Sequence, residues 1–443
     1  MKTGMVLFCT LVLSARINAQ TSYRFSFGKG EQIKGYTPIT PRSKFNRAIG
    51  YGFDQGSIME AVENDPKHLL TSAYITSRRP FYFSVKLPEG NYDIKLVLGD
   101  MKGSSATTVR AECRRLMLNN VRTNRGTVTT NITIHVRDSL IRNEQGNITG
   151  KLRLKQREYG FLHWDDLLTL EFNDSMPKVS AIEIIPNTKA STIFLAGNST
   201  VVDQDREPWA AWGQMLPCFL KPGIVAVANY AESGETLKAF KAERRLDKIW
   251  SMAKPNDYLL IEFAHNDQKP GGNYLDPFTA YKQTLKEWIA AARERKVIPV
   301  LVTSMHRRSF DSAGHIINTL LDYPAAMRQV ALEDSVPLID LNAMSKTLYE
   351  AWGDEKSTRA FVHYPANTFP NQPDELKDNT HFNAYGAFEL ASCVISSIRK
   401  QHLSLEKFIK GDVPLFDPAK PLPAENFYWP RSALVTARWP DGN

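Results

Sequence analysis

The stretch Thr192-Ile193-Phe194-Leu195-Ala196-Gly197-Asn198-Ser199-Thr200 runs from a continuous apolar segment into a glycine and a group of small polar residues. Apolar side chains at successive positions are typical of a strand buried on both faces, as the strands of a parallel sheet are. Four similar runs follow, at residues 225–228, 258–263, 298–303 and 336–341. Helical stretches separate them, and this alternation predicts an α/β domain in which helices cover both faces of a parallel sheet.

Two of the connecting segments carry helical signals. Pro208 favours a helix start, and apolar residues at helical spacing follow it as far as Leu216. A second set of apolar residues, from Ala387 to Ile398, predicts the last helix of the domain. Open α/β sheets bind ligands outside the carboxyl ends of their strands, so we expect the functional groups there.

The first part of the chain, residues 20–187, has a different period. Apolar and polar residues alternate over 81–87 and again over 92–98, with the turn sequence Pro88-Glu89-Gly90-Asn91 between them, which predicts a hairpin with one buried face. Shorter alternating runs follow at 132–136, 168–172 and 182–184. Many short strands without helical periodicity predict an all-β antiparallel sandwich ahead of the α/β domain, which we place at residues 190–412.

A nucleophile, a base and an acid occupy suitable positions in the α/β domain. The hydroxyl of Ser199 needs an imidazole to take its proton, and the imidazole needs a carboxylate to hold its tautomer. His381 and Asp378, three residues apart, supply both groups from one tight loop. A serine after a strand is by itself most often a helix N-cap, so the interpretation depends on the other polar positions as well.

Donors for an oxyanion follow two further strands. Gly234 ends the segment that begins with the run at 225–228, and Asn266 follows the run at 258–263. The backbone N–H groups of Ser199 and Gly234 and the amide of Asn266 would give three donors to a tetrahedral oxyanion. This set of groups predicts acyl transfer through an acyl-enzyme, without a metal or an organic cofactor.

The blocks that contain Ser199, Gly234, Asn266 and His381 resemble the four signature blocks of the SGNH (GDSL-like) hydrolases. Three sequences are most similar to the rhamnogalacturonan acetylesterases of carbohydrate esterase family 12: Gly197-Asn198-Ser199-Thr200, Phe263-Ala264-His265-Asn266-Asp267 and Asp378-Asn379-Thr380-His381-Phe382-Asn383. The resemblance covers residues 190 to 400 and implies a three-layer, flavodoxin-like fold. It also implies a Ser-His-Asp esterase that removes acetyl groups from pectic rhamnogalacturonan, an acetylated plant cell-wall polysaccharide. The all-β part resembles the galactose-binding-like jelly rolls that often precede carbohydrate esterases.

One position departs from the family pattern. The first block usually reads Gly-Asp-Ser, and here Asn198 replaces the aspartate. That aspartate is not the acid of the triad, so we expect altered loop hydrogen bonding rather than lost chemistry. Two alternatives stay open: an esterase for acetyl xylan or another glycan, and a carbohydrate-binding protein whose esterase domain is inactive.

Three other features have two interpretations each. His265 is a rival base, but Asp267 is the only carboxylate close to it in sequence, so His381 is preferred. Arg307 and Arg308 follow the run at 298–303, where a guanidinium can hold a uronate carboxylate, although a solvated charge is the plainer interpretation. The segment 361–373, rich in proline and aromatic residues, either walls the substrate cleft or has a structural role only.

The N-terminal segment predicts an exported protein. Residues 1–19 combine a charged start, a short apolar stretch and a small residue before Gln20, which is the pattern of a secretory signal peptide. Cys9 lacks the small residue that usually precedes a lipidated cysteine, so we expect a periplasmic or secreted protein without a membrane anchor. The proline-rich tail at 413–443 is expected to pack on the surface.

Length, charge and cysteine content narrow the class of protein further. A chain of 443 residues exceeds what one core usually supports, which favours two domains. The net charge of +8 falls to +6 without the leader, which suits a polyanionic glycan, and the absence of a basic helix or RNA-reading motif argues against a nucleic-acid partner. No Cys/His cluster has zinc-ligand spacing. Of Cys113, Cys218 and Cys393, we favour free thiols over a disulfide for the last two.

Overall fold

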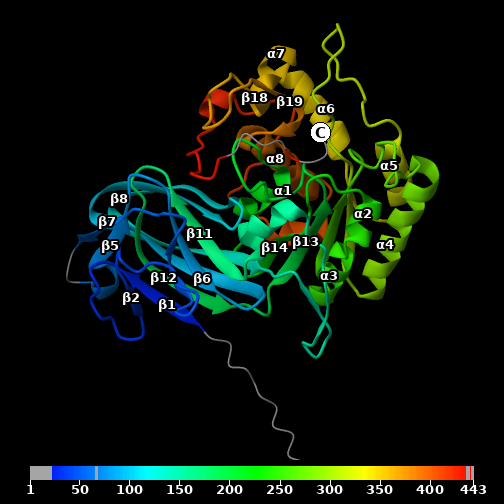
Figure 1. Cartoon of the computed structure of the whole chain (residues 1–443). Coiled ribbons are helices and arrows are strands. Elements are labelled where there is room, and N and C mark those ends of the chain that lie inside the picture. The colour runs from blue at the N-terminus through cyan, green and yellow to red at the C-terminus, as the bar shows by residue number, and fades with distance from the viewer. Residues whose placement is uncertain (1–21, 65–67, 436–439, 441–443) are drawn as a thin grey trace, which may run out of the picture.

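The computed structural model describes residues 22–64, 68–435 and 440, so the expected leader at 1–19 lies outside the described residues. A β-rich domain and an α/β domain lie side by side (Figure 1). The last strand of the first is β12 (Lys178–Pro186), and the second begins with β13 (Ser191–Gly197). Within the described residues, no helix is long and apolar enough to cross a bilayer.

The β-rich domain forms a sandwich of two facing layers. Its other strands are β1 (Tyr23–Phe27), β2 (Thr37–Ile39), β3 (Tyr51–Asp54), β4 (Glu60–Glu63), β5 (Ala73–Thr76), β6 (Phe81–Lys86), β7 (Gly90–Ala111), β8 (Arg115–Val136), β9 (Leu140–Arg142), β10 (Ile148–Lys151) and β11 (Leu167–Asn173). β1 pairs with β2 and β12, whereas β6 pairs with β3 and β11. The rings of Phe25 and Phe27 on β1 nevertheless contact Phe83 on β6, with centroids 5.1 Å apart in each pair. β1 and β6 are four strands apart in a single ten-stranded sheet, so their ring contacts show that this sheet folds over on itself into two facing layers.

The hairpin predicted between residues 81–87 and 92–98 is wrong. β6 and β7 are not paired with each other; β11 pairs with both of them. The hairpin is formed instead by β7 and β8, 22 residues each, whose register shifts between Asp100 and Ser104 and again near Thr107. The alternating residues do enter the core as expected, because alternation reports which face is buried and not which strand is the neighbour.

The second domain has the predicted parallel sheet. Its strand order is β14 (Val225–Asn229), β13, β15 (Tyr258–Glu262), β16 (Ile298–Val302) and β17 (Leu338–Ile339), and every neighbouring pair is parallel. Counted within the domain this is the flavodoxin-like order 2-1-3-4-5. β13 is the strand at which the order reverses, so the residues that follow it open onto the crevice where such sheets bind ligands.

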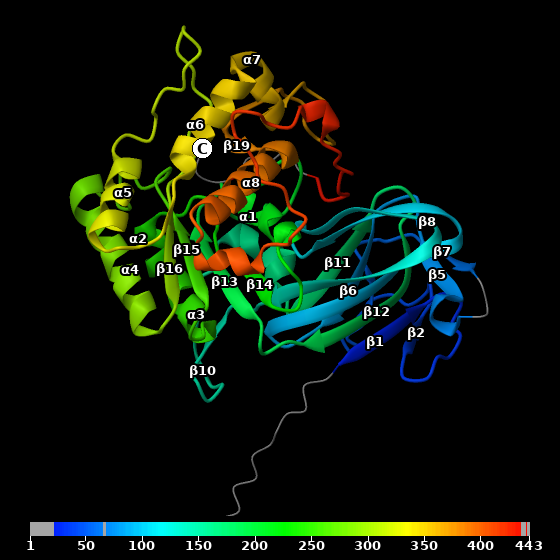
Figure 2. The same cartoon turned by 180° about the vertical axis from the view of Figure 1, so that it is seen from behind.

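Helices cover both faces of this sheet (Figures 1 and 2). They are α1 (Trp212–Met215), α2 (Leu237–Ala242), α3 (Arg245–Met252), α4 (Lys282–Glu294), α5 (Tyr323–Glu333), α6 (Leu341–Trp352), α7 (Asp354–Ser357) and α8 (Ala384–Lys400). Ile193 and Leu195 of β13 pack with α1, α6 and α8, whereas Phe194 and Ala196 pack with α2 to α5. Two cores on opposite faces explain why the strand is apolar at every position.

Two predicted helix boundaries can be compared directly with the structure. The last helix lies where its periodicity placed it, in α8. The start predicted at Pro208 is wrong, because α1 begins at Trp212 and the preceding Ala211 is extended. Trp209 is buried and contacts Val362, Phe369 and Leu376, so tertiary packing and not helix formation determines its place.

The described part of the C-terminal tail crosses from one domain to the other. Most of it is exposed or half-buried, as expected, but Ser432 is 4% exposed. The Ser432 hydroxyl donates to Glu171 of β11 at 2.9 Å, and its backbone N–H donates to Glu207 of the α/β domain at 2.8 Å. Arg110 of β7 donates to the Pro430 carbonyl as well. The tail therefore ties the two domains together.

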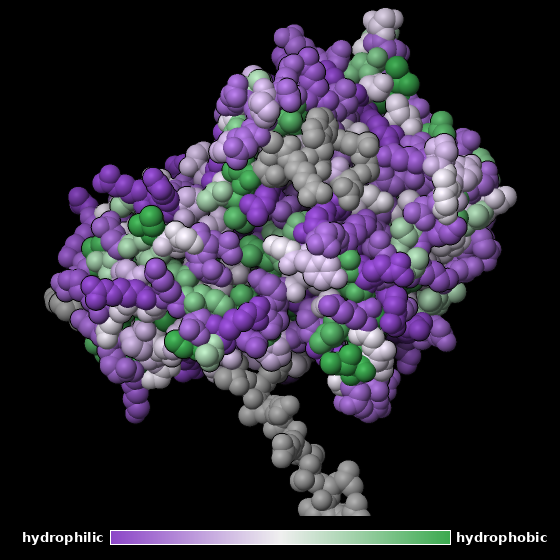
Figure 3. Space-filling model, viewed as in Figure 1, coloured by the Kyte–Doolittle hydropathy of each residue, from purple (hydrophilic) through white to green (hydrophobic). Residues whose placement is uncertain are grey.

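The molecular surface is predominantly polar. On the face shown in Figure 3, hydrophilic residues cover most of the two domains, and apolar side chains occur in small groups between them. Large exposed apolar patches usually mark interaction surfaces for other apolar surfaces.

Candidate active site

The structure brings Ser199, His381 and Asp378 together in one hydrogen-bonded chain. His381 Nε2 lies 2.7 Å from the Ser199 hydroxyl, and Nδ1 lies 2.7 Å from Asp378 Oδ2. All three side chains are buried. Ser199 reaches this place because it lies two residues beyond the carboxyl end of β13.

Asp378 and His381 lie on a strand and not on the tight loop that the sequence suggested. They belong to β19 (Leu376–Phe382), which pairs with β18 (Phe361–Tyr364). Val362 faces Asp378 and Phe361 faces Phe382, so residues 379–381 form a bulge in β19. A bulge re-aims side chains, and here it turns the imidazole towards Ser199.

One carboxylate both shapes the bulge and orients the imidazole. Asp378 Oδ1 accepts the backbone N–H groups of Thr380 and His381, at 2.8 and 2.9 Å, while Oδ2 faces the His381 ring. The indole N–H of Trp209 also donates to Oδ2, at 3.3 Å. Trp209 follows Pro208 in the segment for which the sequence predicts a helix, and no local signal in the sequence indicates this contact.

Asp378 remains ionised at neutral pH. Burial raises the pKa of this carboxyl, but the hydrogen bond and charge of His381 and the backbone N–H groups of His381 and Thr380 outweigh burial and lower the pKa to about 2. An ionised carboxylate keeps the proton of the imidazole on Nδ1 and leaves the lone pair of Nε2 for the Ser199 hydroxyl.

Hydrogen bonds link the loops that carry the expected oxyanion donors to one another and to the Ser199 loop. The loop after β14 is tied to the Ser199 loop by a hydrogen bond from the Glu232 N–H to the Gly197 carbonyl, at 3.2 Å. Asn266 Nδ2 donates to the Glu235 carbonyl at 3.1 Å, which places the amide next to Gly234. Within the described residues, the N–H groups of Ser199 and Gly234 donate to no protein acceptor.

Asn198 makes loop hydrogen bonds that do not differ from those open to the usual aspartate. Asn198 Oδ1 accepts both the N–H and the hydroxyl of Thr200, which are two bonds that an aspartate oxygen would accept equally well. The Thr200 hydroxyl also lies 3.1 Å from the carboxylate of Glu262, a residue that is 1% exposed. An amide at position 198 therefore avoids a second buried acid close to Glu262.

His265 does not compete with His381. Its ring is buried, and neither ring nitrogen has a hydrogen-bond partner among the described residues. Burial, and then the charges of Arg307 and His381, lower the pKa of His265 well below its usual value. His265 is thus a buried neutral imidazole without a carboxylate partner, whereas His381 has both the partner and the contact with Ser199.

The two arginines after β16 differ in their partners. Arg308 forms an ion pair with Asp354 and hydrogen bonds with Ser357 and Asn379, so it has a structural role. Arg307 donates to the carbonyls of His265 and Thr319, and within the described residues no ion pair with a carboxylate is recorded for it. Arg307 is thus a half-buried cation beside the block that carries Asn266.

One group of side chains has ligand atoms close enough together for a metal ion. Atoms of Glu158, His163 and Glu232 lie within 4.8 Å of one another. Both carboxylates are already neutralised, however, since Glu158 pairs with Arg245 and Glu232 pairs with Arg157, at 2.5 Å in each case. We therefore assign these acids to ion pairs between the two domains.

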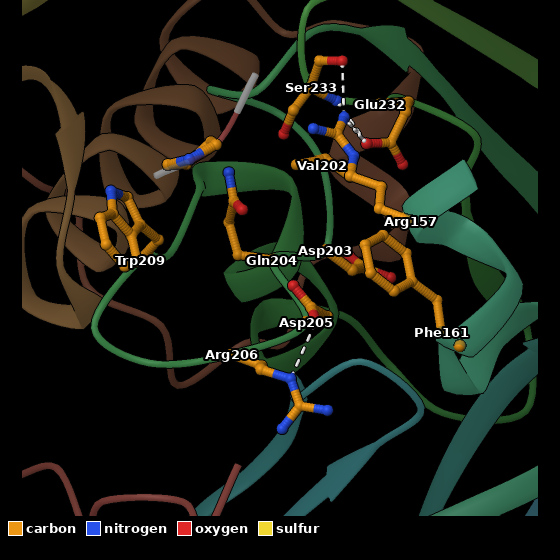
Figure 4. Close-up of a pocket in the computed structure, with 12 residues that line it drawn as sticks. Arg157, Phe161, Val202, Asp203, Gln204, Asp205, Arg206, Trp209, Glu232 and Ser233 are labelled. Carbon is orange, nitrogen blue, oxygen red and sulfur yellow. Dashed lines mark hydrogen bonds and ion pairs between the residues drawn. The ribbon is translucent and has the colours of Figure 1, made fainter. Parts of the chain in front are cut away.

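A pocket of about 270 Å³ lies between the two domains, and its lining residues are shown in Figure 4. Both domains line it: Arg157, Gly160 and Phe161 come from the connection between β10 and β11, and the other side includes Gln204, Arg206, Trp209 and Ser233. Gln204 donates to the Ser199 carbonyl at 2.8 Å, and Ser233 precedes Gly234. Aromatic faces beside many polar groups are a lining suited to a polar ligand with a ring.

Comparison with protein families agrees with this architecture. Residues 195–387 match the GDSL-like lipase/acylhydrolase family, and residues 23–141 match the galactose-binding domain-like module of β-agarase/YXIM esterase-like proteins. Over 220 residues the chain is 44% identical to rhamnogalacturonan acetylesterase RhgT of Bacillus subtilis, covering 49% of this chain and 94% of that protein.

The chain belongs to the GDSL-like lipase/acylhydrolase family. It is a carboxylic ester hydrolase with an N-terminal galactose-binding-like domain. A longer match, 26% identical over 393 residues, links it to the esterase YxiM of Bacillus subtilis and covers 86% of this chain and 92% of that protein. The solved structure of YxiM overlaps with 87% of this chain and 99% of its own, at 23% identity and a TM-score of 0.46.

The buried carboxyl of Glu262, which lies 3.1 Å from the Thr200 hydroxyl, gives a test of the polar contacts next to Ser199. This carboxylate accepts hydrogen bonds from Trp212 and Ser304, but burial dominates and raises its pKa from 4.5 to about 7. An acid with a raised pKa in the folded state stabilises the protein below its unfolded pKa, and this stability is lost as the pH rises through 7. We expect Glu262→Gln to gain stability relative to wild type between pH 5 and 8, by on the order of 3 kcal/mol at most.

Denaturant unfolding of both proteins at several pH values measures this difference. A difference in unfolding free energy that is independent of pH, or that favours wild type more as the pH rises, would contradict the assignment of a raised pKa to Glu262.

Proposed function

We propose that the protein is a carbohydrate O-acetyl esterase that uses Ser199, His381 and Asp378 as a catalytic triad. The observation that carries the proposal is the continuous hydrogen-bonded chain from Asp378 through His381 to the Ser199 hydroxyl. Geometry of this kind lets an imidazole activate a serine for attack on an ester.

The proposed reaction has two steps. Ser199 Oγ attacks the acetyl carbonyl carbon while His381 Nε2 takes the hydroxyl proton, and the Ser199 and Gly234 N–H groups with the Asn266 amide stabilise the oxyanion. His381 then gives its proton to the departing sugar hydroxyl, which leaves an acetyl-serine. Water attacks this ester with His381 again as the base, and acetate is released.

Substitution of the triad tests this mechanism. We expect Ser199→Ala and His381→Ala each to lower kcat on a small acetyl ester by about 10³-fold or more, because the nucleophile or its base is lost. Circular dichroism and thermal unfolding should show that both variants remain folded. His265→Ala is the matched control on the rival imidazole, and it should retain far more activity than His381→Ala.

Labelling with a serine-directed organophosphonate separates an esterase from a carbohydrate-binding protein with an inactive domain. We expect wild type to be labelled at Ser199 and Ser199→Ala to remain unlabelled. Folded wild-type protein that neither reacts with the phosphonate nor releases acetate would favour the binding alternative.

We propose pectic rhamnogalacturonan, a plant cell-wall polysaccharide, as the preferred substrate. Two observations support it: the 44% identity with a rhamnogalacturonan acetylesterase over half the chain, and the Arg307 guanidinium, which has no recorded carboxylate partner beside the Asn266 block. A half-buried cation of this kind suits a uronate carboxylate, which a neutral glycan such as xylan does not offer.

Acetate release from acetylated rhamnogalacturonan and from acetylated xylan distinguishes the two substrates. We expect a higher kcat/KM on rhamnogalacturonan, and we expect Arg307→Gln to reduce this preference mainly through KM while leaving turnover of a small neutral ester unchanged. Equal or reversed rates in wild type would favour the sibling activity on xylan or another glycan.

We propose in addition that residues 1–19 direct export and are then removed, which gives a periplasmic or secreted enzyme. The charged start and the short apolar stretch support this. N-terminal sequencing of the protein recovered from its native cells should begin at or near Gln20, and a mature protein that begins at Met1 would refute the proposal.

A further inference from the structure

Two cations of the β-rich domain reach the loop that carries Gly234. They lie on the connection between β10 and β11, in and just before the 3₁₀ turn η2 (Gln156–Gly160). Lys155 Nζ donates to the Ser233 carbonyl at 2.7 Å, and Arg157 Nη2 donates to the same oxygen at 2.8 Å (Figure 4 shows the arginine). No pattern in the sequence indicates this contact, since the residues are 76 or more positions apart.

Ion pairs hold the same two cations on either side of this carbonyl. Arg157 pairs with Glu232 and Lys155 pairs with Glu235, at 2.5 Å in each case. The two acids are almost fully buried, whereas the side chains of Lys155 and Arg157 are 22% and 12% exposed. Burial raises the pKa of Glu232 to about 7 and that of Glu235 to about 8, and the two cations oppose this rise. The hydrogen bonds of both cations to the Ser233 carbonyl do not depend on the charge of these acids, so they fix the loop to the β-rich domain.

The connection between β10 and β11 is itself firmly anchored. Glu158 Oε2 accepts the Lys155 N–H at 2.7 Å and pairs with Arg245, and both side chains of that ion pair are completely buried. The Trp164 indole donates to the other oxygen of Glu158 at 3.0 Å. Lys155 and Arg157 therefore extend from a rigid base.

The planarity of the peptide bond connects this carbonyl to the active site. In a trans peptide the C=O of one residue and the N–H of the next point in opposite directions. Because the Ser233 C=O points at Lys155 and Arg157, the Gly234 N–H points away from the β-rich domain. Gly234 has a φ of +78°, a left-handed conformation that a glycine adopts without strain, and its N–H donates to no acceptor within the described residues.

The two cations also strengthen the donor that they orient. A cation that donates to a carbonyl oxygen draws electron density towards that oxygen and away from the N–H of the same peptide bond. The N–H becomes a stronger donor, as in hydrogen bonds that polarise one another in series. We propose that Lys155 and Arg157 are positioning residues for the oxyanion hole, which aim the Gly234 N–H at the oxyanion from the opposite side of its own peptide bond. The β-rich domain then supports turnover directly, without touching the substrate's reacting atoms.

This inference rests on the proposed esterase mechanism, so the test uses a small neutral acetyl ester that needs no contact with the glycan subsites. We expect the double variant Lys155→Met/Arg157→Met to lower kcat by about 10²-fold, which is the scale of losing one oxyanion donor, with KM within about twofold of wild type. The single variant Arg157→Lys keeps a cation and a donor at this position, so its kcat should be much closer to wild type than that of the double variant. Arg153→Gln removes an exposed charge from the same connection and is the matched control, with activity unchanged.

Two further measurements separate positioning from simple loss of stability. Arg157→Gln/Glu232→Gln removes both charges of one ion pair, so it should remain folded and still show reduced kcat. Hydrogen exchange of the peptide that spans residues 231–237 should be faster in the double methionine variant and unchanged in Arg153→Gln, whatever the activity of either protein.

Normal kcat together with normal exchange in the folded double variant would overturn the positioning role while leaving the triad intact. Failure of the triad itself has a different result, because Ser199→Ala would then hydrolyse the ester as fast as wild type. A raised KM with an unchanged kcat would also contradict the inference, since the oxyanion forms only after the substrate is bound.

Discussion

The pairing of buried charges across the domain boundary is the constraint on which the rest of this structure depends. Arg115 of β8 pairs with Asp203 at 2.8 Å, and Arg245 of α3 pairs with Glu158 of the β-rich domain at 2.5 Å. All four side chains are at most 1% exposed. Removal of one partner from a buried pair typically costs about 3–5 kcal/mol, so the two domains are held in one arrangement.

This arrangement matters because ion pairs and hydrogen bonds from the β-rich domain reach the two loops that carry Ser199 and Gly234. Asp203 lies four residues beyond Ser199, and its pairing with Arg115 fixes the Ser199 loop from the β-rich side. Lys155 and Arg157 fix the Gly234 loop from the same side. The Ser199 loop and the Gly234 loop therefore share a support that lies outside the α/β domain.

The other half of the site depends on packing within the α/β domain. The bulge in β19 presents His381, and the hairpin of β18 and β19 packs against Trp209 through Val362 and Phe369. For the segment 361–373, the sequence left open a cleft wall or a structural role. In the structure its residues pack behind β19 and support the strand that carries His381. Trp209 connects this hairpin to the Ser199 loop, since its indole also donates to Asp378.

Sequence alone determined the layers of both domains, the order of the polar blocks and the residue types of the site, because burial periodicity and side-chain chemistry are local properties. It predicted Ser199 and His381 correctly as neighbours. It was wrong about the pairing of residues 81–98 and about the helix start at Pro208, and it could not indicate the contact of Lys155 and Arg157 with Ser233. Strand partners, bulges and ion pairs between domains are decided only by tertiary structure, since they join residues whose separation along the chain leaves no periodic signal.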